Sequence, residues 1–213
     1  EVGHGNGLGA SSIQLGHSKV SDHKMIEVAR ANLRVSKLGV FTIPGFGTIA
    51  RDLKPAIEQG VDVVRVGSHC TEADTTARHI SFARESGKDA YGNLMMSHMA
   101  SPQVLAQECN KMHSYGAMGV VLMDSAGAML PSEVTERVKF LTENVEIPIG
   151  FHAHNNLGLA IANSIAAAEA GATILDGCTR GFGAGAGNAQ LEVLVAVLEK
   201  MGYSTGIDLY KVL

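Results

Sequence analysis

The chain has 213 residues, of which 46% are hydrophobic and 18% are charged, and its formal net charge at pH 7 is −4. This composition is typical of a folded domain rather than a disordered chain, and the acidic balance without a Lys/Arg block argues against a nucleic-acid partner. No apolar run approaches the length of about 18 residues that suggests a membrane span, and three cysteines without a C-x-x-C pair favour a reducing, cytoplasmic location over a disulfide framework.

Short apolar or β-branched runs recur along the chain and predict strands. Counting the opening stretch, there are seven such runs, at Glu1–Gly3, Val40–Ile43, Val61–Val66, Tyr91–Met96, Gly119–Met123, Ile147–Phe151 and Ala172–Leu175. Runs that are apolar along most of their length suit strands buried on both faces, as in parallel sheets.

The segments between these runs carry helix signals. An N-cap residue, a proline at the first helical position or a terminating glycine marks them at Ser21, Ser101-Pro102, Ser132 (before Glu133–Leu141) and Gly87. Two further helices are expected near the end of the chain, at Ala189–Lys200 and from Asp208 to Leu213.

Regular alternation of strands and helices leaves two architectures, a (β/α)8 barrel or an open doubly wound sheet. Seven units in 213 residues extrapolate to about eight in the roughly 250 residues typical of a barrel, so we favour an incomplete TIM barrel forming one catalytic domain over residues 1–213. The chain begins without Met, inside a predicted strand, and stops within a helical turn. We therefore expect a fragment whose missing unit precedes Glu1.

Polar residues gather where the predicted strands end, which is where a barrel carries its active site. Five of the nine histidines have this position: His4, His69, His98, His152 and His154.

The H-x-H pair at His152 and His154 is the first candidate for chemistry. Alternate strand residues project to one side with a spacing of about 6 to 7 Å, which allows two imidazoles to bind one cation. The pair can equally be two strand-end residues bonded to neighbours or water. A metal site also needs a carboxylate, for which Asp124, Asp176 and Glu72 are the candidates.

A glycine-rich loop at 181–188 precedes the last long predicted helix. It fits the loose dinucleotide pattern but lies too near the chain end to open a βαβ unit, so a loop presenting N–H groups to an anion is the better interpretation. Asn188 is either the N-cap of that helix or a residue that reaches the site.

Three other features give weaker indications of a functional site. Asp124-Ser125 can be a capping pair before Gly127, and His98 can be a histidine packed among methionines. Cys70 is expected to be buried for structural reasons rather than to act as a nucleophile. The sequence contains no G-x-S-x-G motif, so serine-hydrolase chemistry has little support.

Several of these segments together resemble one enzyme family. In order, they are "EVGHGNGLGASS", "PGFGT", "VRVGSHCTEAD", "LMMSHM", "MDSAGAM", "HAHNNLGLAIANSIAA" and "GFGAGAGNAQLEVL". They are similar to the 4-hydroxy-2-oxovalerate aldolases, members of the metal-dependent barrel superfamily that includes hydroxymethylglutaryl-CoA lyase. The resemblance covers essentially the whole chain.

The resemblance implies a lyase of aromatic-compound catabolism that splits 4-hydroxy-2-oxopentanoate into pyruvate and acetaldehyde. It implies a divalent cation, usually Mn²⁺ with Mg²⁺ or Co²⁺ as substitutes, held by His152 and His154. It places Ser125 and His152 near the substrate, with Asn188 and His98 as further site candidates. It also implies an acylating acetaldehyde dehydrogenase as the partner of the parent enzyme.

The sequence departs from the family at both ends. The family's Arg-Asp-Gly-x-x-His motif supplies the third metal ligand, an enolate-stabilising arginine and the proposed base, and it has no match here, so no catalytic residue is assigned. The family's C-terminal helical domain is also unmatched. We expect little activity from these residues alone, and oligomerisation would cover the strand edges of an open barrel. A Claisen-type lyase or synthase acting on acyl-CoA and a non-catalytic barrel fragment stay open as alternatives.

Overall fold

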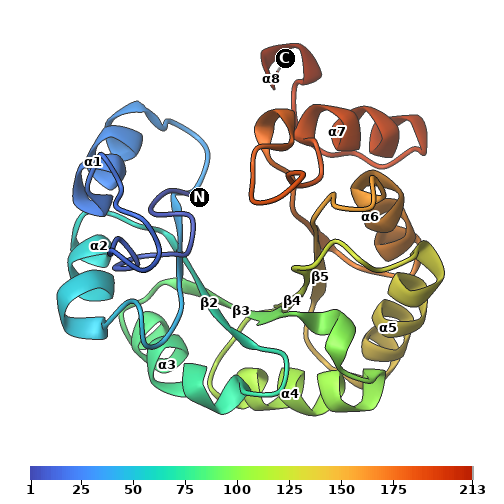
Figure 1. Cartoon of the computed structure of the whole chain (residues 1–213), viewed down its shortest axis with the longest axis horizontal. Helices are drawn as coiled ribbons and strands as arrows, with labels where there is room; N and C mark the ends of the chain where they lie inside the picture. The colour runs from blue at the N-terminus through green and yellow to red at the C-terminus, as the bar shows by residue number, and fades with distance from the viewer. Residues whose placement is uncertain (213) are drawn as a thin grey trace. The chain divides into compact units, whose positions relative to one another are not determined.

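The computed structural model describes residues 1–212 (Figure 1). Its strands are β1 (Gly39–Thr42), β2 (Val63–His69), β3 (Asp89–Met95), β4 (Val120–Asp124), β5 (Ile149–Ala153) and β6 (Ile174–Leu175). They form one sheet in the order β1-β2-β3-β4-β5-β6, and the pairs β1–β2 and β5–β6 are parallel. Helices connect each strand to the next, which is the repeating unit of a (β/α) barrel. The predicted fold class, an incomplete barrel, is confirmed.

The helices lie between and after the strands. The α-helices are α1 (Asp22–Asn32), α2 (Lys54–Glu58), α3 (Ala77–Glu85), α4 (Pro102–Ser114), α5 (Pro131–Asn144), α6 (Ala160–Glu169), α7 (Leu191–Lys200) and α8 (Leu209–Val212). Shorter turns are the π-turn η1 (Ile49–Leu53) and the 3₁₀ turns η2 (Ala73–Thr76), η3 (Ser97–Met99) and η4 (Thr179–Gly181). The last predicted helix extends to Leu213, which lies outside the described residues.

The opening stretch is the one predicted strand that the structure does not form. Val2 donates its backbone N–H to Gly39 of β1 at 3.0 Å, and Leu8 donates to Phe41 at 2.8 Å. Between these two bonds the chain turns through Gly3, Gly5 and Gly7, so no continuous ladder develops. The segment lies along β1 as an irregular strap, and six strands rather than seven are present in residues 1–212.

The predicted helix boundaries are mostly confirmed by their caps. The Ser21 hydroxyl accepts the N–H of Lys24, and the Ser101 hydroxyl accepts that of Val104. Gly87 has φ +71°, just beyond the end of α3. The prediction for Ser132 was wrong.

Helix α5 begins at Pro131, one residue before Ser132, because proline suits the first helical position. The Glu133 carboxylate then accepts the N–H of the N-cap residue Leu130 at 2.8 Å, which takes over the cap that Ser132 was expected to provide.

The chain forms two compact units. Unit 1 comprises residues 1–93 and 108–120, and unit 2 comprises residues 94–107 and 121–213, of which 213 is outside the described part. In unit 1 the buried core includes Ile26, Leu38, Val64 and Ile80. In unit 2 it includes Leu122, Val138, Leu141 and Phe151. Burial of each such side chain contributes about 1.5 to 3 kcal/mol.

The cysteines behave as the sequence predicts. Cys70, Cys109 and Cys178 are all free thiols. Cys70 is fully buried and burial raises the pKa of its thiol, while burial raises the pKa of Cys109 to about 12. Both are packing residues rather than nucleophiles. No helix within residues 1–212 has the length and apolar character needed to cross a membrane.

Candidate functional site

Two imidazoles face each other at the end of β5, in unit 2. His152 is in the strand and His154 follows its last residue, so the two side chains leave the backbone on the same side. Their ring centroids are 5.1 Å apart, with the ring planes inclined at 63°. The predicted juxtaposition of the H-x-H pair is therefore present.

His152 is bonded to a carboxylate that directly follows the neighbouring strand β6. In the parallel ladder Gly150 pairs with Ile174 and Phe151 with Leu175, so the next position brings Asp176 beside His152. The Nδ1 of His152 lies 2.9 Å from Oδ2 of Asp176, and the two side chains are 14% and 16% exposed. A carboxylate only accepts hydrogen bonds, so Nδ1 carries the proton and Nε2 of a neutral ring has a free lone pair.

The surroundings of His154 favour the neutral form of its ring. Burial is the largest influence and lowers the pKa of its ring, and the neighbouring His152 lowers it further. A hydrogen bond to the carbonyl of Ala184 and the charge of Asp124 act in the opposite direction but are weaker. A carbonyl only accepts, so one ring nitrogen of His154 is protonated and the other is available to a ligand.

Asn188 lies beside His154 and has spare bonding capacity. The two residues form an isolated antiparallel bridge. The Asn188 amide nitrogen donates to the Phe182 carbonyl at 3.3 Å and lies 3.2 Å from the Cys178 sulfur. Its Oδ1 is buried without a hydrogen-bond partner, and the residue is only 9% exposed.

The N-cap interpretation of Asn188 was wrong. Helix α7 starts at Leu191, with Gln190 as the N-cap residue and no side-chain cap. The reason is that Asn188 and Ala189 still pair in an extended manner: Asn188 N–H donates to Gly181 and Ala189 N–H donates to Ala153. A side chain at Gly183 would collide with the Asn188 amide, which explains a glycine at that position.

The two asparagines after the histidines join the surrounding loops. The Asn156 amide donates to the Ala126 carbonyl and accepts the N–H of Ala186, both at 2.9 Å. The Asn155 carboxamide oxygen accepts the N–H of Ala160 at the start of α6, at 3.1 Å. The loop after β4 and the glycine-rich loop are thus both fixed against the H-x-H-N-N segment, a role that the sequence motif alone did not reveal.

The side chains of Asp124 and Ser125 accept hydrogen bonds from different loops. The Asp124 carboxylate accepts the N–H groups of Ala128 and Met129, both at 3.1 Å, which confirms a capping role. The Ser125 hydroxyl instead accepts the N–H of Met96 at 3.0 Å, from the loop after β3. Met96 has φ +56°, a left-handed conformation that is uncommon for a side chain of this size and is held in part by this bond. The Ser125 hydroxyl proton is left to donate elsewhere.

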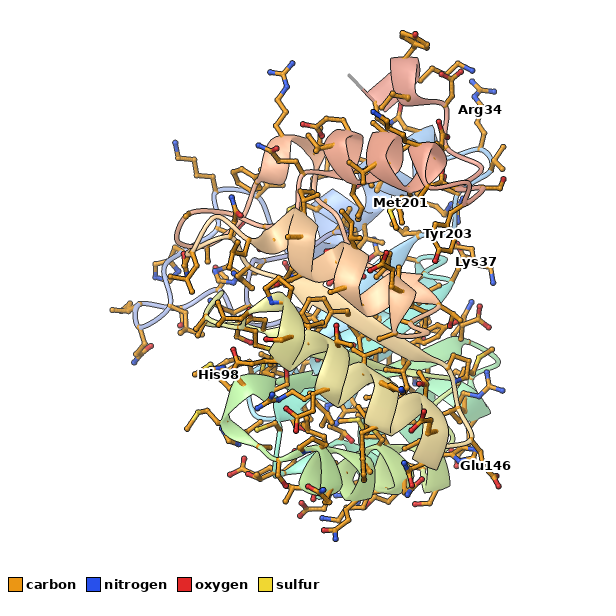
Figure 2. All side chains as sticks on the ribbon, turned by 90° about the vertical axis from the view of Figure 1, so that its right-hand side faces the viewer. Arg34, Lys37, His98, Glu146, Met201 and Tyr203 are labelled. Carbon is orange, nitrogen blue, oxygen red and sulfur yellow. The ribbon has the colours of Figure 1, made fainter. Side chains whose placement is uncertain are left out.

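His98 lies on η3 (labelled in Figure 2), and its backbone is bonded to α5. Its carbonyl accepts an N–H of Arg137 at 3.3 Å, and its Nδ1 is buried without a partner. Met99, one of the methionines expected to pack around it, is 62% exposed. Met95 and Met96 are only half-buried, so the methionine-rich core layer predicted for His98 is not formed.

The three carboxylates considered as metal ligands are placed differently. Asp176 binds His152, Asp124 caps the turn after β4, and Glu72 belongs to unit 1. Within residues 1–212, no group of three or more His, Cys, Asp or Glu side chains is arranged to hold a metal ion. The structure brings the two imidazoles together and pairs the backbone of Asn188, whose amide oxygen has no partner, with that of His154.

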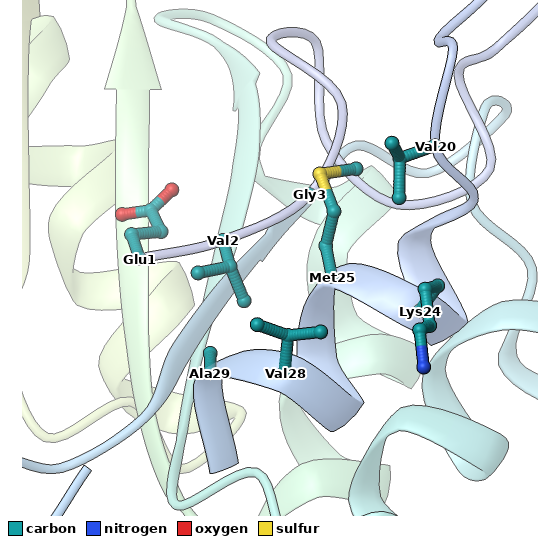
Figure 3. A pocket seen from close by; sticks show the side chains of 8 residues that line it. All are labelled: Glu1, Val2, Gly3, Val20, Lys24, Met25, Val28 and Ala29. Carbon is teal, nitrogen blue, oxygen red and sulfur yellow. The ribbon is translucent and has the colours of Figure 1, made fainter. Parts of the chain in front are cut away.

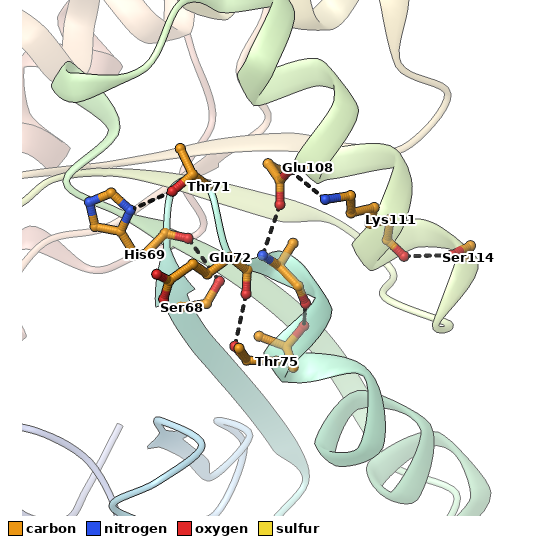
Figure 4. A network of polar contacts seen from close by, with 10 residues as sticks. Ser68, His69, Thr71, Glu72, Thr75, Glu108, Lys111 and Ser114 are labelled. Carbon is orange, nitrogen blue, oxygen red and sulfur yellow. Dashed lines mark hydrogen bonds and ion pairs between the residues drawn. The ribbon is translucent and has the colours of Figure 1, made fainter.

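The predicted strand-end residues of unit 1 are occupied by local bonds. His69 Nδ1 lies 2.9 Å from the Thr71 hydroxyl (Figure 4). The N–H of Ala73, at the other end of this segment, donates at 2.8 Å to the buried carboxylate of Glu108 in α4, which also binds Lys111 at 2.7 Å. His4 is similarly used, because its Nδ1 accepts the N–H of Asn6 and its Nε2 donates to Gly16.

A groove of about 580 Å³ in unit 1 lies between the opening strap and α1 (Figure 3). Its lining is mainly apolar, with Val2, Val20, Met25 and Val28 as the larger side chains. It contains none of the residues predicted to carry chemistry, so we do not place the functional site there.

The chain is similar to proteins of known name. Residues 7–213 match the family described as HMGL-like. A 4-hydroxy-2-oxovalerate aldolase of Spirochaeta aurantia is 63% identical over 213 residues, covering 100% of this chain and 62% of that protein. The protein of that name from Pectobacterium atrosepticum is 59% identical, with 100% and 62% covered. The chain therefore spans about three-fifths of the length of these relatives.

Solved structures agree on the fold. The HMG-CoA lyase of Bacillus subtilis superposes with a TM-score of 0.78 at 21% identity, covering 88% of this chain and 71% of that one. At this identity the likeness concerns the fold alone.

Proposed function

The chain belongs to the HMGL-like family, and from this premise we propose that it forms the metal- and substrate-binding part of a lyase that cleaves 4-hydroxy-2-oxopentanoate into pyruvate and acetaldehyde. The name of its relatives supports this substrate. Because the chain spans about three-fifths of those relatives, we assign the reaction to the full-length protein. The observation that carries the proposal is the pairing of two ligand-ready imidazoles with a buried amide oxygen that has no partner.

We propose that His152, His154 and Asn188 hold a divalent cation. The fit rests on Asn188, whose buried Oδ1 lacks the hydrogen-bond partner that such an atom normally has. Imidazole nitrogens with an amide oxygen form a mixed donor set that accommodates Mn²⁺, with Mg²⁺ or Co²⁺ as substitutes. The family resemblance assigns a carboxylate ligand to the part of the full-length protein outside these residues.

When bound, the cation supplies a Lewis acid for the negative charge that develops on the 2-oxo group as the C3–C4 bond breaks. The residues of this chain orient the substrate for that step. Ser125 is fixed by its bond to Met96, and its free hydroxyl proton donates to an oxygen of the 2-oxo acid. Burial lowers the pKa of His154, which favours the neutral ring that would bind the cation over a role as an acid.

The bond electrons of C3–C4 pass to the pyruvate enolate, and the C4 hydroxyl proton passes to a base. In line with the resemblance, we place that base outside the present residues. Acetaldehyde leaves as a reactive product, and we propose an acylating acetaldehyde dehydrogenase as the partner that consumes it in the catabolism of aromatic compounds.

Pyruvate release by the full-length protein tests this function. Metal-stripped protein is mixed with 4-hydroxy-2-oxopentanoate, and pyruvate is followed with lactate dehydrogenase before and after addition of Mn²⁺. We expect release only after metal is added, and no cleavage of a 3-hydroxyacyl-CoA. Folded protein that releases no pyruvate with Mn²⁺, Mg²⁺ or Co²⁺, or that cleaves the acyl-CoA instead, would overturn the proposal.

A further inference from the structure

Asp176 and His152 form the best-defined side-chain pair near the site. His152 is in β5, and Asp176 directly follows the last residue of the parallel strand β6, one position beyond the Phe151–Leu175 pair. The Asp176 backbone N–H donates to Phe151 at 3.1 Å, which fixes the residue against β5 independently of any loop. The two side chains are mostly buried, so the bond between them is little exposed to water.

We propose that Asp176 is a positioning residue, which fixes the tautomer and the ring orientation of His152 so that Nε2 binds the cation. This inference rests on the proposed function, because it assumes that His152 is a metal ligand. It assigns Asp176 a role different from the direct ligand considered from the sequence.

The geometry explains why Asp176 does not bind the same cation as His152. Its Oδ2 lies 2.9 Å from Nδ1. The two ring nitrogens of an imidazole project in divergent directions, so a cation on Nε2 lies away from the Asp176 oxygen. A histidine that binds a metal commonly donates its other ring N–H to a carboxylate or carbonyl, which orients the ring and raises its basicity.

The two imidazoles differ in what holds them. His152 is backed by a carboxylate directly after β6, whereas His154 is backed by the neutral carbonyl of Ala184 in the glycine-rich loop. The carboxylate partner makes His152 the stronger electron donor of the two imidazoles, and β5 makes it the more rigid one. The affinity of His152 for the cation therefore depends more on its hydrogen-bond partner than that of His154 does.

Two readouts on the full-length protein test the role of Asp176. The first is the tautomer of His152 in metal-free protein, read by ¹⁵N-histidine NMR and assigned with H152A. The second is the Kd for Mn²⁺, measured by electron paramagnetic resonance. The variants are D176A and D176N, and D89N is the matched control because Asp89 pairs with Lys37 on the surface.

We expect His152 in the wild type to be the Nδ1–H tautomer. In D176A we expect a mixture of tautomers and a Kd for Mn²⁺ that is about 10- to 100-fold higher. D176N retains an acceptor oxygen, so we expect it to keep the tautomer and to weaken Mn²⁺ binding by a smaller factor. D89N should change neither. If D176A does not fold, D176N decides the question by the same two measurements.

The inference would be overturned by an Nε2–H tautomer of His152 in the wild type, or by an unchanged Kd for Mn²⁺ in both Asp176 variants. It would also be overturned if D176N lost as much Mn²⁺ affinity as H152A, because Asp176 would then be a metal ligand itself. Absence of Mn²⁺ binding by the wild type would overturn it as well. The proposed function fails separately, when the wild type binds Mn²⁺ as expected but releases no pyruvate.

Discussion

The loop after β2 and the loops after β5 and β6 both carry polar side chains at strand ends, but they use them differently. In the loop after β2, the Ala73 N–H donates to the Glu108 carboxylate of α4, which also binds Lys111, and the Thr76 hydroxyl donates to a backbone carbonyl. After β5 and β6, the buried Oδ1 of Asn188 accepts nothing, and each imidazole has one nitrogen not used by the bonds described.

This difference separates structural polar residues from those of a site. A buried polar atom without a partner costs about 1 to 3 kcal/mol, which a fold tolerates where a ligand supplies the missing bond. Strand-end position alone did not distinguish the two groups in the sequence. Buried atoms without a partner also occur at Thr42, His79 and His98. The site is marked by the combination of such an atom on Asn188 with the imidazole pair, and this leads to opposite expectations for substitutions in the two regions.

The largest effect is expected for His154→Ala in the full-length protein. Loss of an imidazole ligand should remove several kcal/mol of transition-state stabilisation, which is roughly a 1,000-fold fall in kcat/KM for pyruvate release. His113→Ala is the matched control, since His113 is an exposed histidine on α4. Equal activity of the two variants would contradict the assignment of the site.

Asn188→Ala should weaken Mn²⁺ binding without weakening the fold. We expect a Kd for Mn²⁺ about 10- to 100-fold higher, while the free energy of unfolding stays the same or rises by about 1 kcal/mol because an unpartnered buried amide is removed. Metal titration and urea unfolding of metal-free protein measure the two quantities. A clear loss of stability with unchanged Mn²⁺ affinity would place Asn188 among the structural residues.

Glu108→Ala should show the reverse behaviour. The buried carboxylate binds a backbone N–H and a lysine, so its removal should lower the free energy of unfolding by about 2 to 3 kcal/mol. The kcat/KM of the folded fraction should stay unchanged. Lys111→Ala, which removes a 44% exposed partner, should cost less than about 1 kcal/mol.

The smallest effect is expected for Asp62→Asn, and it depends on pH. A hydrogen bond from the Leu38 N–H, with a weaker contribution from Arg30, lowers the pKa of Asp62. A lowered folded pKa stabilises the protein at pH values above the unfolded pKa of about 3.9, and this contribution disappears as the pH falls through the folded pKa.

Asp62→Asn should therefore be less stable than the wild type at pH 7, by under about 1 kcal/mol because the carboxylate is partly exposed, and the gap should narrow by pH 3. Urea unfolding at both pH values measures it. Glu58→Gln removes a carboxylate of an exposed ion pair and serves as the control. If the difference in free energy of unfolding between the wild type and Asp62→Asn widens on acidification, the predicted direction of the pH dependence is wrong.

The strands and most helix starts could be predicted from sequence because they depend on local patterns. Runs such as Val61–Val66 are buried wherever they occur in a parallel sheet, and Ser21 caps the helix that immediately follows it. The same-side placement of His152 and His154 also follows from strand geometry over three residues.

The partners of the site residues could not be predicted because they come from distant segments. Asp176 was one of three carboxylates considered, and only the β5–β6 register brings it to Nδ1 of His152. Ser125 holds Met96, 29 residues away. The N-cap alternative for Asn188 was wrong because the backbone at Asn188 and Ala189 still pairs with the end of β5, and α7 starts only at Leu191.

The β5–β6 register also bears on how this pair can be inherited. Gly150 is matched with Ile174, and the ladder, not the length of the connection, sets which residue faces His152. A lineage can therefore gain or lose residues in the turn at 170–172, after α6, without separating the two side chains. A deletion within β6 would instead place a neighbour of Asp176 opposite the imidazole, and the ligand would lose its support although both residues persist. In such descendants, the presence of His152 alone would predict metal affinity poorly. The register between β5 and β6 would predict it better.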